Sequence, residues 1–124
     1  AVSSVAAKVT EVLMTSDVEV VRTSALPNQF DLAQNYPNPF NPATTITFFL
    51  IEPSHVRLAI YNIQGSLVRQ LKNGHLNQGE FQVRWDGTND MNGPVSTGIY
   101  FYRLGVATRS GEVFEQSRKM VFMK

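Results

Sequence analysis

The chain has 124 residues, a formal net charge of +1, 43% apolar residues and 17% charged residues. This length suits one domain with a sizeable core, and the small net charge argues against a nucleic-acid-binding protein. No apolar run approaches the ~20 residues that a membrane-spanning helix needs. The chain has no cysteine, so the fold cannot depend on disulfides.

The first segment, residues 1–25, contains no glycine, proline or asparagine and has many valines. Valine and threonine favour a strand, although part of this segment can also be written as a short helix. Two interpretations stay open, an extra strand or the tail of an upstream cargo region. Residues 26–43 are expected to form a linker and a proline-rich lead-in, because Pro27-Asn28 is a turn signal.

The lead-in contains the run Tyr36-Pro37-Asn38-Pro39-Phe40-Asn41-Pro42. Each proline fixes φ and removes a backbone donor, and each residue before a proline is pushed toward extended geometry. The run therefore predicts a stiff connection that is neither helix nor central strand. Because exposed aromatic rings are unfavourable, we expect Tyr36 and Phe40 to dock on the domain as structural anchors.

From Thr44 onward, apolar and polar residues alternate in short segments separated by turn residues. This pattern predicts six strands, near 44–50, 55–61, 67–71, 80–85, 98–106 and 112–123, with a possible seventh before Tyr36. The pair Asn73-Gly74 predicts a tight hairpin after the third strand. Short strands at this spacing are typical of an antiparallel β-sandwich, which we place at 44–124.

Side chains with catalytic potential are sparse. His55 and His75 fall at a strand start and in an expected hairpin loop, without a serine and carboxylate at suggestive spacing. No glycine-rich phosphate loop precedes a helix, so we expect no enzyme activity. Trp85, the only tryptophan, is interpreted as a core anchor and not as a ligand platform.

A polar stretch at 86–93 offers several side-chain oxygens, the ligand type that calcium prefers. The candidate ligands would be Asp86, Asn89, Asp90 and Asn92, but their spacing is not that of an EF-hand. The favoured alternative is a turn-rich loop whose Asp and Asn side chains bond their own backbone. We therefore expect no cofactor, and calcium stays open as the alternative.

Four aromatic residues, Tyr61, Tyr100, Phe101 and Tyr102, lie on two of the predicted strands. They could form a sugar-stacking face. We favour a structural role, because alternating aromatics in a sandwich usually form cross-strand pairs and core.

Several motifs follow one another in a fixed order. The proline run is followed by Trp85-Asp86-Gly87, then by Gly98-Ile99-Tyr100, and the chain ends with Arg118-Lys119-Met120-Val121-Phe122-Met123-Lys124. Over residues 26–124 this order resembles the type A C-terminal sorting domain of the type IX secretion system, found on exported proteins of Bacteroidota and their relatives. It is also similar to the Ig-like domain of flagellar hook-capping proteins, which implies a shared fold more than a shared function.

The resemblance implies an Ig-like antiparallel β-sandwich of about seven strands that serves as a secretion signal on a cargo protein. The cargo would pass through the periplasm to the cell surface or the medium. The implied partners are the outer-membrane translocon and a surface sortase, which often joins the cargo to anionic lipopolysaccharide. By motif, recognition would rest on Arg118, Lys119, Met120, Val121 and Lys124, with Gly98 and Tyr100 shaping the strand pair beneath them.

Two alternatives accompany this interpretation. The terminal strand could be a handle that accepts another strand by β-addition, with Arg118 and Lys119 discouraging self-pairing. The competing function is a module retained on the cell surface, either a filament or adhesin subunit or a carbohydrate-binding accessory. If the domain is cleaved off, the segment from Ser24 to Asn35 is the expected zone, because exposed linkers concentrate proteolysis.

Overall fold

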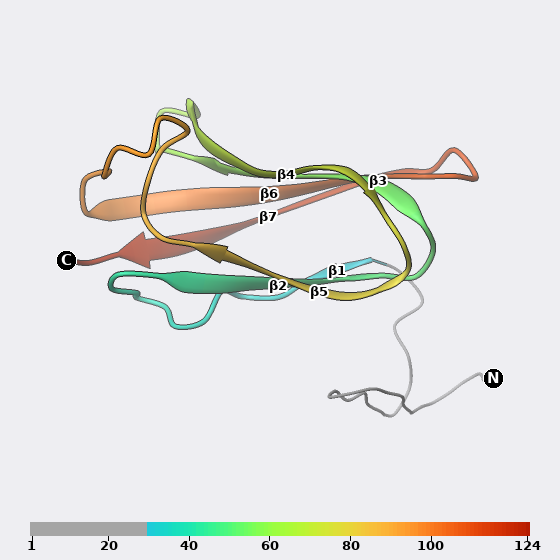
Figure 1. Cartoon of the computed structure of the whole chain (residues 1–124), viewed down its shortest axis with the longest axis horizontal. Helices are drawn as coiled ribbons and strands as arrows, with labels where there is room; N and C mark the ends of the chain where they lie inside the picture. The colour runs from blue at the N-terminus through green and yellow to red at the C-terminus, as the bar shows by residue number, and fades with distance from the viewer. Residues whose placement is uncertain (1–29) are drawn as a thin grey trace.

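A computed structural model describes residues 30–124, which fold as two antiparallel sheets packed face to face (Figure 1). The predicted all-β, Ig-like sandwich of about seven strands is confirmed. One sheet has the strand order β1-β2-β5 and the other the order β4-β3-β6-β7. The strands are β1 (Asp31–Leu32), β2 (Thr44–Leu50), β3 (Ser54–Tyr61), β4 (Leu67–Leu76), β5 (Gly79–Trp85), β6 (Gly98–Thr108) and β7 (Val113–Phe122).

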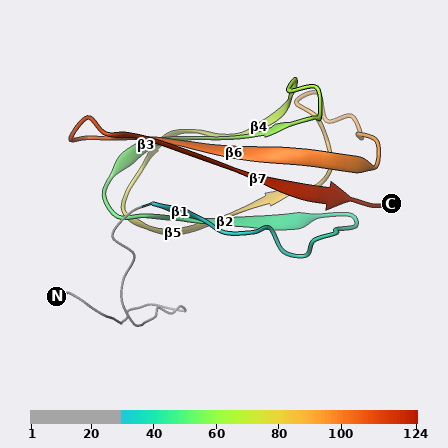
Figure 2. The ribbon, with the colours of Figure 1, turned by 180° about the vertical axis from the view of Figure 1, so that it is seen from behind.

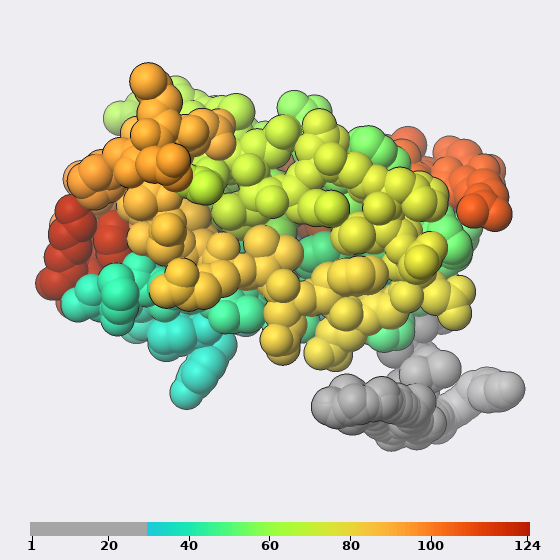
Figure 3. Space-filling model, in the orientation of Figure 1, coloured from blue at the N-terminus to red at the C-terminus, as the bar shows by residue number. Residues whose placement is uncertain are grey.

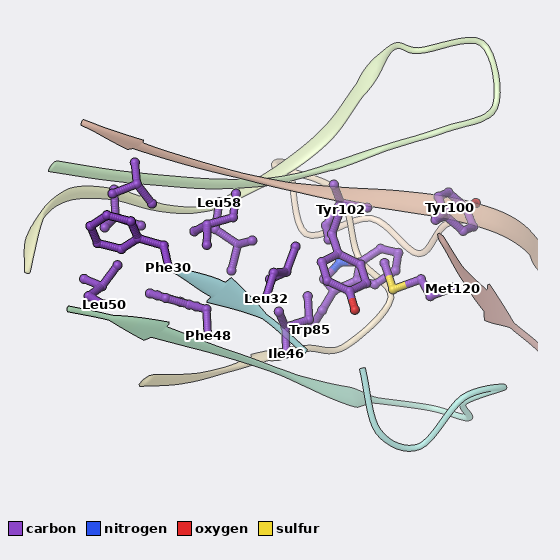
Figure 4. Packing of buried hydrophobic residues seen from close by; sticks show 14 of the residues in the cluster. Phe30, Leu32, Ile46, Phe48, Leu50, Leu58, Trp85, Tyr100, Tyr102 and Met120 are labelled. Atoms are coloured by element: carbon purple, nitrogen blue, oxygen red, sulfur yellow. The ribbon is translucent and has the colours of Figure 1, made fainter. Parts of the chain in front are cut away.

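The alternation read from the sequence sets which side chains enter the core. In β2, Ile46, Phe48 and Leu50 are buried while the residues between them are half-buried. In β6, Tyr102 and Leu104 point inward. Figure 4 shows the side chains of Ile46, Phe48, Leu50 and Tyr102 in the space between the sheets, together with Trp85 and Met120. Successive residues of a strand face opposite sides, so this pattern builds a single apolar layer.

The domain begins earlier than the predicted boundary at Thr44. Phe30 and Leu32 are buried in the core, and Asp31–Leu32 pairs with β2 at Phe48 and Phe49. Part of the expected linker is therefore a strand, and the possible seventh strand before Tyr36 is present as β1. The two interpretations of residues 1–25, and residues 26–29 of the linker, lie outside the described residues.

The predicted hairpin at Asn73-Gly74 is wrong. Both residues continue β4 and pair with β3, Asn73 opposite Arg57 and Gly74 opposite Val56. The chain turns later, between Leu76 and Gly79, and passes from one sheet to the other. A two-residue hairpin requires its flanking strands to pair, and β4 and β5 belong to different sheets.

The first and last strands lie side by side, as the view from behind shows (Figure 2). The Arg118 Nε atom on β7 donates a hydrogen bond to the Leu32 carbonyl oxygen on β1. This contact links the two sheets along one side of the sandwich, through two residues that are 86 positions apart in the sequence. Within residues 30–124, no helix has the length and apolar character needed to cross a membrane.

Candidate functional site

Four of the sequence motifs meet in one aromatic cluster at the end of the sandwich that holds the C-terminus. Phe40 of the lead-in stacks on Phe122 of β7, with ring centroids 4.8 Å apart and an interplanar angle of 8°. Trp85 packs against both rings, at 5.5 Å from Phe40 and 6.2 Å from Phe122. Tyr100 completes the cluster with an edge contact to Trp85 at 5.4 Å. Motifs far apart in the sequence thus share one hydrophobic contact.

Gly87 explains why the Trp-Asp-Gly motif ends in glycine. Its φ is 76°, a left-handed conformation that other residues rarely adopt. A Cβ atom at this position would lie 2.8 Å from the Phe122 Cζ atom. The loop can therefore pass over the Phe122 ring only where a side chain is missing.

The lead-in runs along the outer edge of β7. The Val121 amide donates to Asn38 Oδ1 at 3.0 Å, and the Phe40 amide donates to the Val121 carbonyl oxygen at 3.0 Å. The Met123 amide donates to the Phe40 carbonyl oxygen at 3.0 Å. Gln34 Nε2 donates to the Lys119 carbonyl oxygen at 2.8 Å. The backbone edge at the end of the chain is therefore already occupied.

Buried polar groups fix the path of the lead-in. The Tyr102 hydroxyl donates to the Ala33 carbonyl oxygen at 2.7 Å and accepts from the Asn35 amide at 2.8 Å. Burial raises the pKa of Tyr102 above its ordinary value, so the hydroxyl keeps the proton that it donates. Asn35 Nδ2 donates to Thr44 Oγ1 at 3.0 Å, and Thr44 Oγ1 donates to the Pro37 carbonyl oxygen at 2.8 Å.

The two aromatic residues of the proline run have opposite environments. Phe40 is 1% exposed, so its expected role as an anchor is confirmed. Tyr36 is 80% exposed, so the expectation that its ring docks on the domain is wrong. The Tyr36 backbone is nevertheless fixed, because its amide and carbonyl groups both bond to Thr45, at 3.0 and 2.9 Å. The packing site of this cluster is filled by Phe40, Trp85 and Phe122, and Tyr36 lies outside it.

The five residues expected to carry recognition have different surroundings. Met120 is fully buried in the core, while Arg118 and Val121 are half-buried and Lys119 and Lys124 are exposed. The Lys124 Nζ atom lies 5.8 Å from the centre of the Phe122 ring. Only part of the terminal motif is therefore open to a partner, and its backbone edge is closed to β-addition unless the lead-in moves.

The remaining structural motif residues occupy the same end of the domain. Gly98 has a φ of 147° and pairs with Phe122, and the Tyr100 hydroxyl donates to the Ser96 carbonyl oxygen at 2.7 Å. In the lead-in, the side chains exposed to solvent include Pro37, Asn38, Pro39, Asn41 and Pro42. Trp85 is 1% exposed, as expected of a core anchor.

The polar loop after β5 holds a positively charged side chain of the protein itself. Arg69 Nη1 donates to Thr88 Oγ1 at 2.7 Å, to the Asn89 carbonyl oxygen at 2.6 Å and to Asn92 Oδ1 at 3.3 Å. A guanidinium thus lies among these three oxygens of the loop. In the described part of the chain, no group of three or more His, Cys, Asp or Glu residues is arranged to hold a metal ion.

The carboxylate and amide side chains of this loop bond within the protein. Asp86 Oδ1 accepts from Thr88 Oγ1 at 2.5 Å, and this bond, helped by the charge of Arg69, lowers the pKa of Asp86. Asn89 Oδ1 accepts from two backbone amides of the loop, and Asp90 Oδ1 accepts from the Gln70 amide. The Asn89 bonds are those of the turn-rich loop favoured from the sequence, whereas Asp86 bonds a side chain and Asp90 bonds the backbone of β4.

The four aromatic residues considered as a sugar-stacking face do not share a face. Tyr100 and Tyr102 point into the core, while Phe101 lies on the outer side of β6, opposite Tyr61 of β3. The Arg103 guanidinium covers the Tyr61 ring at 4.8 Å from its centre. The set is therefore split between core and cross-strand pairs, as the structural interpretation expected.

Sequence reasoning missed the residues that join the lead-in to the rest of the domain. Gln34 and Asn35 contact partners 85 and 67 residues away, and such distances leave no local signal. Phe122 could have been found, because it continues the alternation of Met120 in the final strand. Gly87 is ambiguous in sequence, because glycine is common in any loop.

Comparison with known proteins gives one family and two related structures. Residues 39–112 match the model of the FlgD Ig-like domain. Dimeric latent PorU from Porphyromonas gingivalis superposes with a TM-score of 0.64 and 25% identity, over 84% of this chain and 10% of that chain. FlgD from P. aeruginosa superposes with a TM-score of 0.53 and 18% identity, over 64% of this chain and 61% of that chain. No curated protein matches this chain significantly.

The two structures carry different weight. The likeness to FlgD shows the fold, whereas the PorU match also extends over most of this chain. This chain spans about a tenth of the PorU chain that it matches. Together with the family model, the PorU match supports the resemblance to type IX C-terminal sorting domains, with similarity to FlgD. Because the family model covers more than half of its residues, the chain belongs to the FlgD Ig-like domain family.

Proposed function

We propose that this domain is a sorting signal that directs a cargo protein across the outer membrane through the type IX secretion system. The observation that carries the proposal is the joining of the proline lead-in and the terminal Lys-Met-Val segment. Asn38 and Phe40 bond to Val121 and Met123, so the two most specific motifs lie together. The exposed side chains of both motifs therefore lie at the same end of the domain.

The partners follow from the same proposal. The outer-membrane translocon would bind the folded domain in the periplasm, and a surface sortase would act on the cargo junction, with anionic lipopolysaccharide as one possible attachment. The domain itself would perform no catalysis and would need no cofactor. The destination of the cargo would be the cell surface or the medium.

A second candidate is a module that stays attached and has a mechanical or binding role at the cell surface. The observation that favours it is the family match, because a FlgD Ig-like domain is equally compatible with a structural role. This candidate predicts that the domain remains on the mature protein and that the terminal side chains can be changed without loss of delivery.

The test is to fuse all 124 residues to the C-terminus of an inert periplasmic reporter in a host with this secretion system. We expect the reporter at the cell surface or in the medium, and in the periplasm of a matched strain without the translocon. Retention in the periplasm of both strains would contradict the proposal. The mass of the exported reporter then distinguishes a cleaved signal from a retained module.

Deletion of the last residues is a poor test of recognition. Met120 and Phe122 are core residues, so their removal would unfold the domain as well as remove the motif. Point changes at exposed positions, chiefly Lys119 and Lys124, separate the two effects.

A further inference from the structure

We infer that the secretion machinery recognises the lead-in and the terminal strand together, as one composite surface, and does not recognise the terminal residues alone. The composite surface consists of the exposed side chains of Tyr36, Asn38, Lys119, Met123 and Lys124. Its partner is a protein that presents acidic side chains and a pocket for an aromatic ring. This inference rests on the proposed function and names the site that would carry it.

The two segments are held together by the structure itself. Gln34 and Asn38, two residues before and two residues after Tyr36, both bond to the backbone edge of β7. Figure 3 shows the lead-in, coloured cyan to teal, adjoining the red end of the chain at one end of the molecule. A partner that covers the terminal motif therefore also meets the lead-in.

The mode of recognition follows from the closed edge. The outward backbone groups of Val121 already bond to Asn38 and Phe40. A partner strand could pair there only by displacing the lead-in and breaking the stack of Phe40 on Phe122. Recognition at this position is therefore by side chains, and the exposed side chains belong to both segments.

Tyr36 is the strongest candidate for an aromatic anchor. Its ring is 80% exposed, while both of its backbone polar groups bond to Thr45. The following Pro37 has a fixed φ, and its carbonyl oxygen accepts from Asn35 and Thr44. A ring presented on a fixed backbone loses little conformational entropy on binding, and tyrosine is enriched among residues that dominate binding energy.

The charge of the composite surface selects an acidic partner. Residues 33–43 contain no charged side chain, and residues 116–124 contain Arg118, Lys119 and Lys124 but no aspartate or glutamate. The ionisable side chains of these two segments are therefore all positive, which favours association with a negative partner. A protein partner fits better than a lipid surface. The side chains lie on a fixed loop, so they present a defined shape, and a fluid lipid surface has no complementary shape to match it.

The experiment measures export of the reporter fused to the full chain, with wild type, Tyr36→Ala, Lys119→Glu and the conservative variants Tyr36→Phe and Lys119→Arg. The matched controls are Met91→Ala, which removes a side chain that is 89% exposed on another loop, and Arg109→Glu, which reverses an exposed charge in the β6–β7 turn. Thermal unfolding of each purified domain verifies that it is folded.

We expect Tyr36→Ala and Lys119→Glu each to reduce export by about tenfold or more, the size of effect seen when a binding anchor is removed. The conservative variants and both controls should be exported like wild type. Export of wild type together with unreduced export of folded Tyr36→Ala would overturn the composite surface and leave the proposed function standing. Failure of wild type to be exported would overturn both.

A second measurement addresses the class of partner. Purified wild-type domain is mixed with vesicles of anionic phospholipid at physiological salt, and co-sedimentation is measured. We expect no binding. Binding that is lost in Tyr36→Ala and Lys119→Glu but kept in Met91→Ala and Arg109→Glu would overturn the protein partner in favour of a membrane surface.

Discussion

The outer edge of β7 has two halves with different surroundings. From the Lys119 carbonyl group to the Met123 amide, the lead-in bonds to the outward backbone groups at the end of the strand. From Val113 to Ser117, β7 pairs with β6 on its inner side, and within residues 30–124 no strand is hydrogen-bonded to its outer side. The same strand therefore has a closed edge at its terminal motif and an open edge before it.

This difference shows that closure of the β7 edge depends on the packing of residues that are far from β7 in the sequence, and not on the strand itself. An unpaired edge is a template for other strands, and here the template is removed where the terminal motif lies. The lead-in stays in place because Phe40 is buried against Phe122 and Trp85. Changes at Phe40 or at its neighbours should therefore weaken the closed half and leave the open half as it is.

Among the substitutions considered, Phe40→Ala should destabilise the closed half of the β7 edge, and the domain, the most. Loss of a buried phenylalanine costs about 3–5 kcal/mol, and the lead-in would lose its anchor on β7. The measurement is the free energy of unfolding from a denaturant titration. The control is Phe101→Ala, on the outer face of β6, which should cost less than half as much, and equal losses would contradict the role of Phe40.

Gly87→Ala should have the second largest effect. The new Cβ would lie 2.8 Å from the Phe122 ring, at a φ of 76°, and strained backbone plus overpacking cost about 2–3 kcal/mol. Gly111→Ala is the matched control, because Gly111 also has a positive φ but has open space around its Cβ position. If Gly111→Ala lowered the free energy of unfolding as much as Gly87→Ala does, contact with Phe122 would not be the cause of the Gly87→Ala effect.

Asn38→Ala should remove one of the hydrogen bonds that close the edge, without removing any buried side chain. The Val121 amide would lose its acceptor, at a cost of about 1 kcal/mol in unfolding free energy. Asn41→Ala, another exposed position in the lead-in, serves as the control and should change stability little. Faster exchange of the Val121 amide in Asn38→Ala but not in Asn41→Ala is the sharper measurement.

The acid dependence of stability should depend on Asp86, whose loop holds Trp85 behind Phe40. The pKa of Asp86 is lowered in the folded state by the hydrogen bond from Thr88, with help from Arg69. A lowered pKa means that the folded state favours the carboxylate, so this stabilisation is present above the ordinary value of 3.8 and is lost as the pH falls below it.

Unfolding of wild type and Asp86→Asn as a function of pH tests this prediction. The variant should lack part of the decline below pH ~4. Identical acid limbs in the two proteins would show that Asp86 makes no such contribution. The effect should be small, because the side chain of Asp86 is exposed.

Tyr36→Ala should change stability least, by less than about 0.5 kcal/mol. The ring is exposed, and the backbone bonds to Thr45 do not involve the side chain. Denaturant unfolding of this variant beside Phe40→Ala compares two aromatic residues of one motif. A decrease in the free energy of unfolding close to that of Phe40→Ala would show that the Tyr36 ring packs on the domain.

Most of the strands could be predicted because alternation is a local property. The buried faces of β2 and β6 follow directly from residues such as Ile46, Phe48 and Tyr102. The turn at Asn73-Gly74 was wrong because the local signal does not say which sheet the next strand joins. Gly74 instead lies inside β4 and pairs with Val56 of β3.

The candidate site was predictable only in part. The motif order identified the terminal segment as a recognition site and gave the lead-in only a structural role, and it did not predict that Gln34 and Asn38 bond to β7. Sequence also offered no reason to separate Tyr36 from Phe40, because both are aromatic residues next to prolines. Their different exposures follow from which ring faces Trp85 and Phe122, and that depends on the assembled sandwich.

Amide hydrogen exchange along β7 tests the central claim, that the lead-in closes the edge of the terminal motif, most directly. The uninterrupted pairing with β6 gives odd-numbered residues of β7 outward amides, so Glu115 and Ser117 are the internal reference for Val121 and Met123. We predict that the Val121 and Met123 amides exchange at least about tenfold more slowly than those of Glu115 and Ser117. Equal, fast exchange at all four amides would contradict the account.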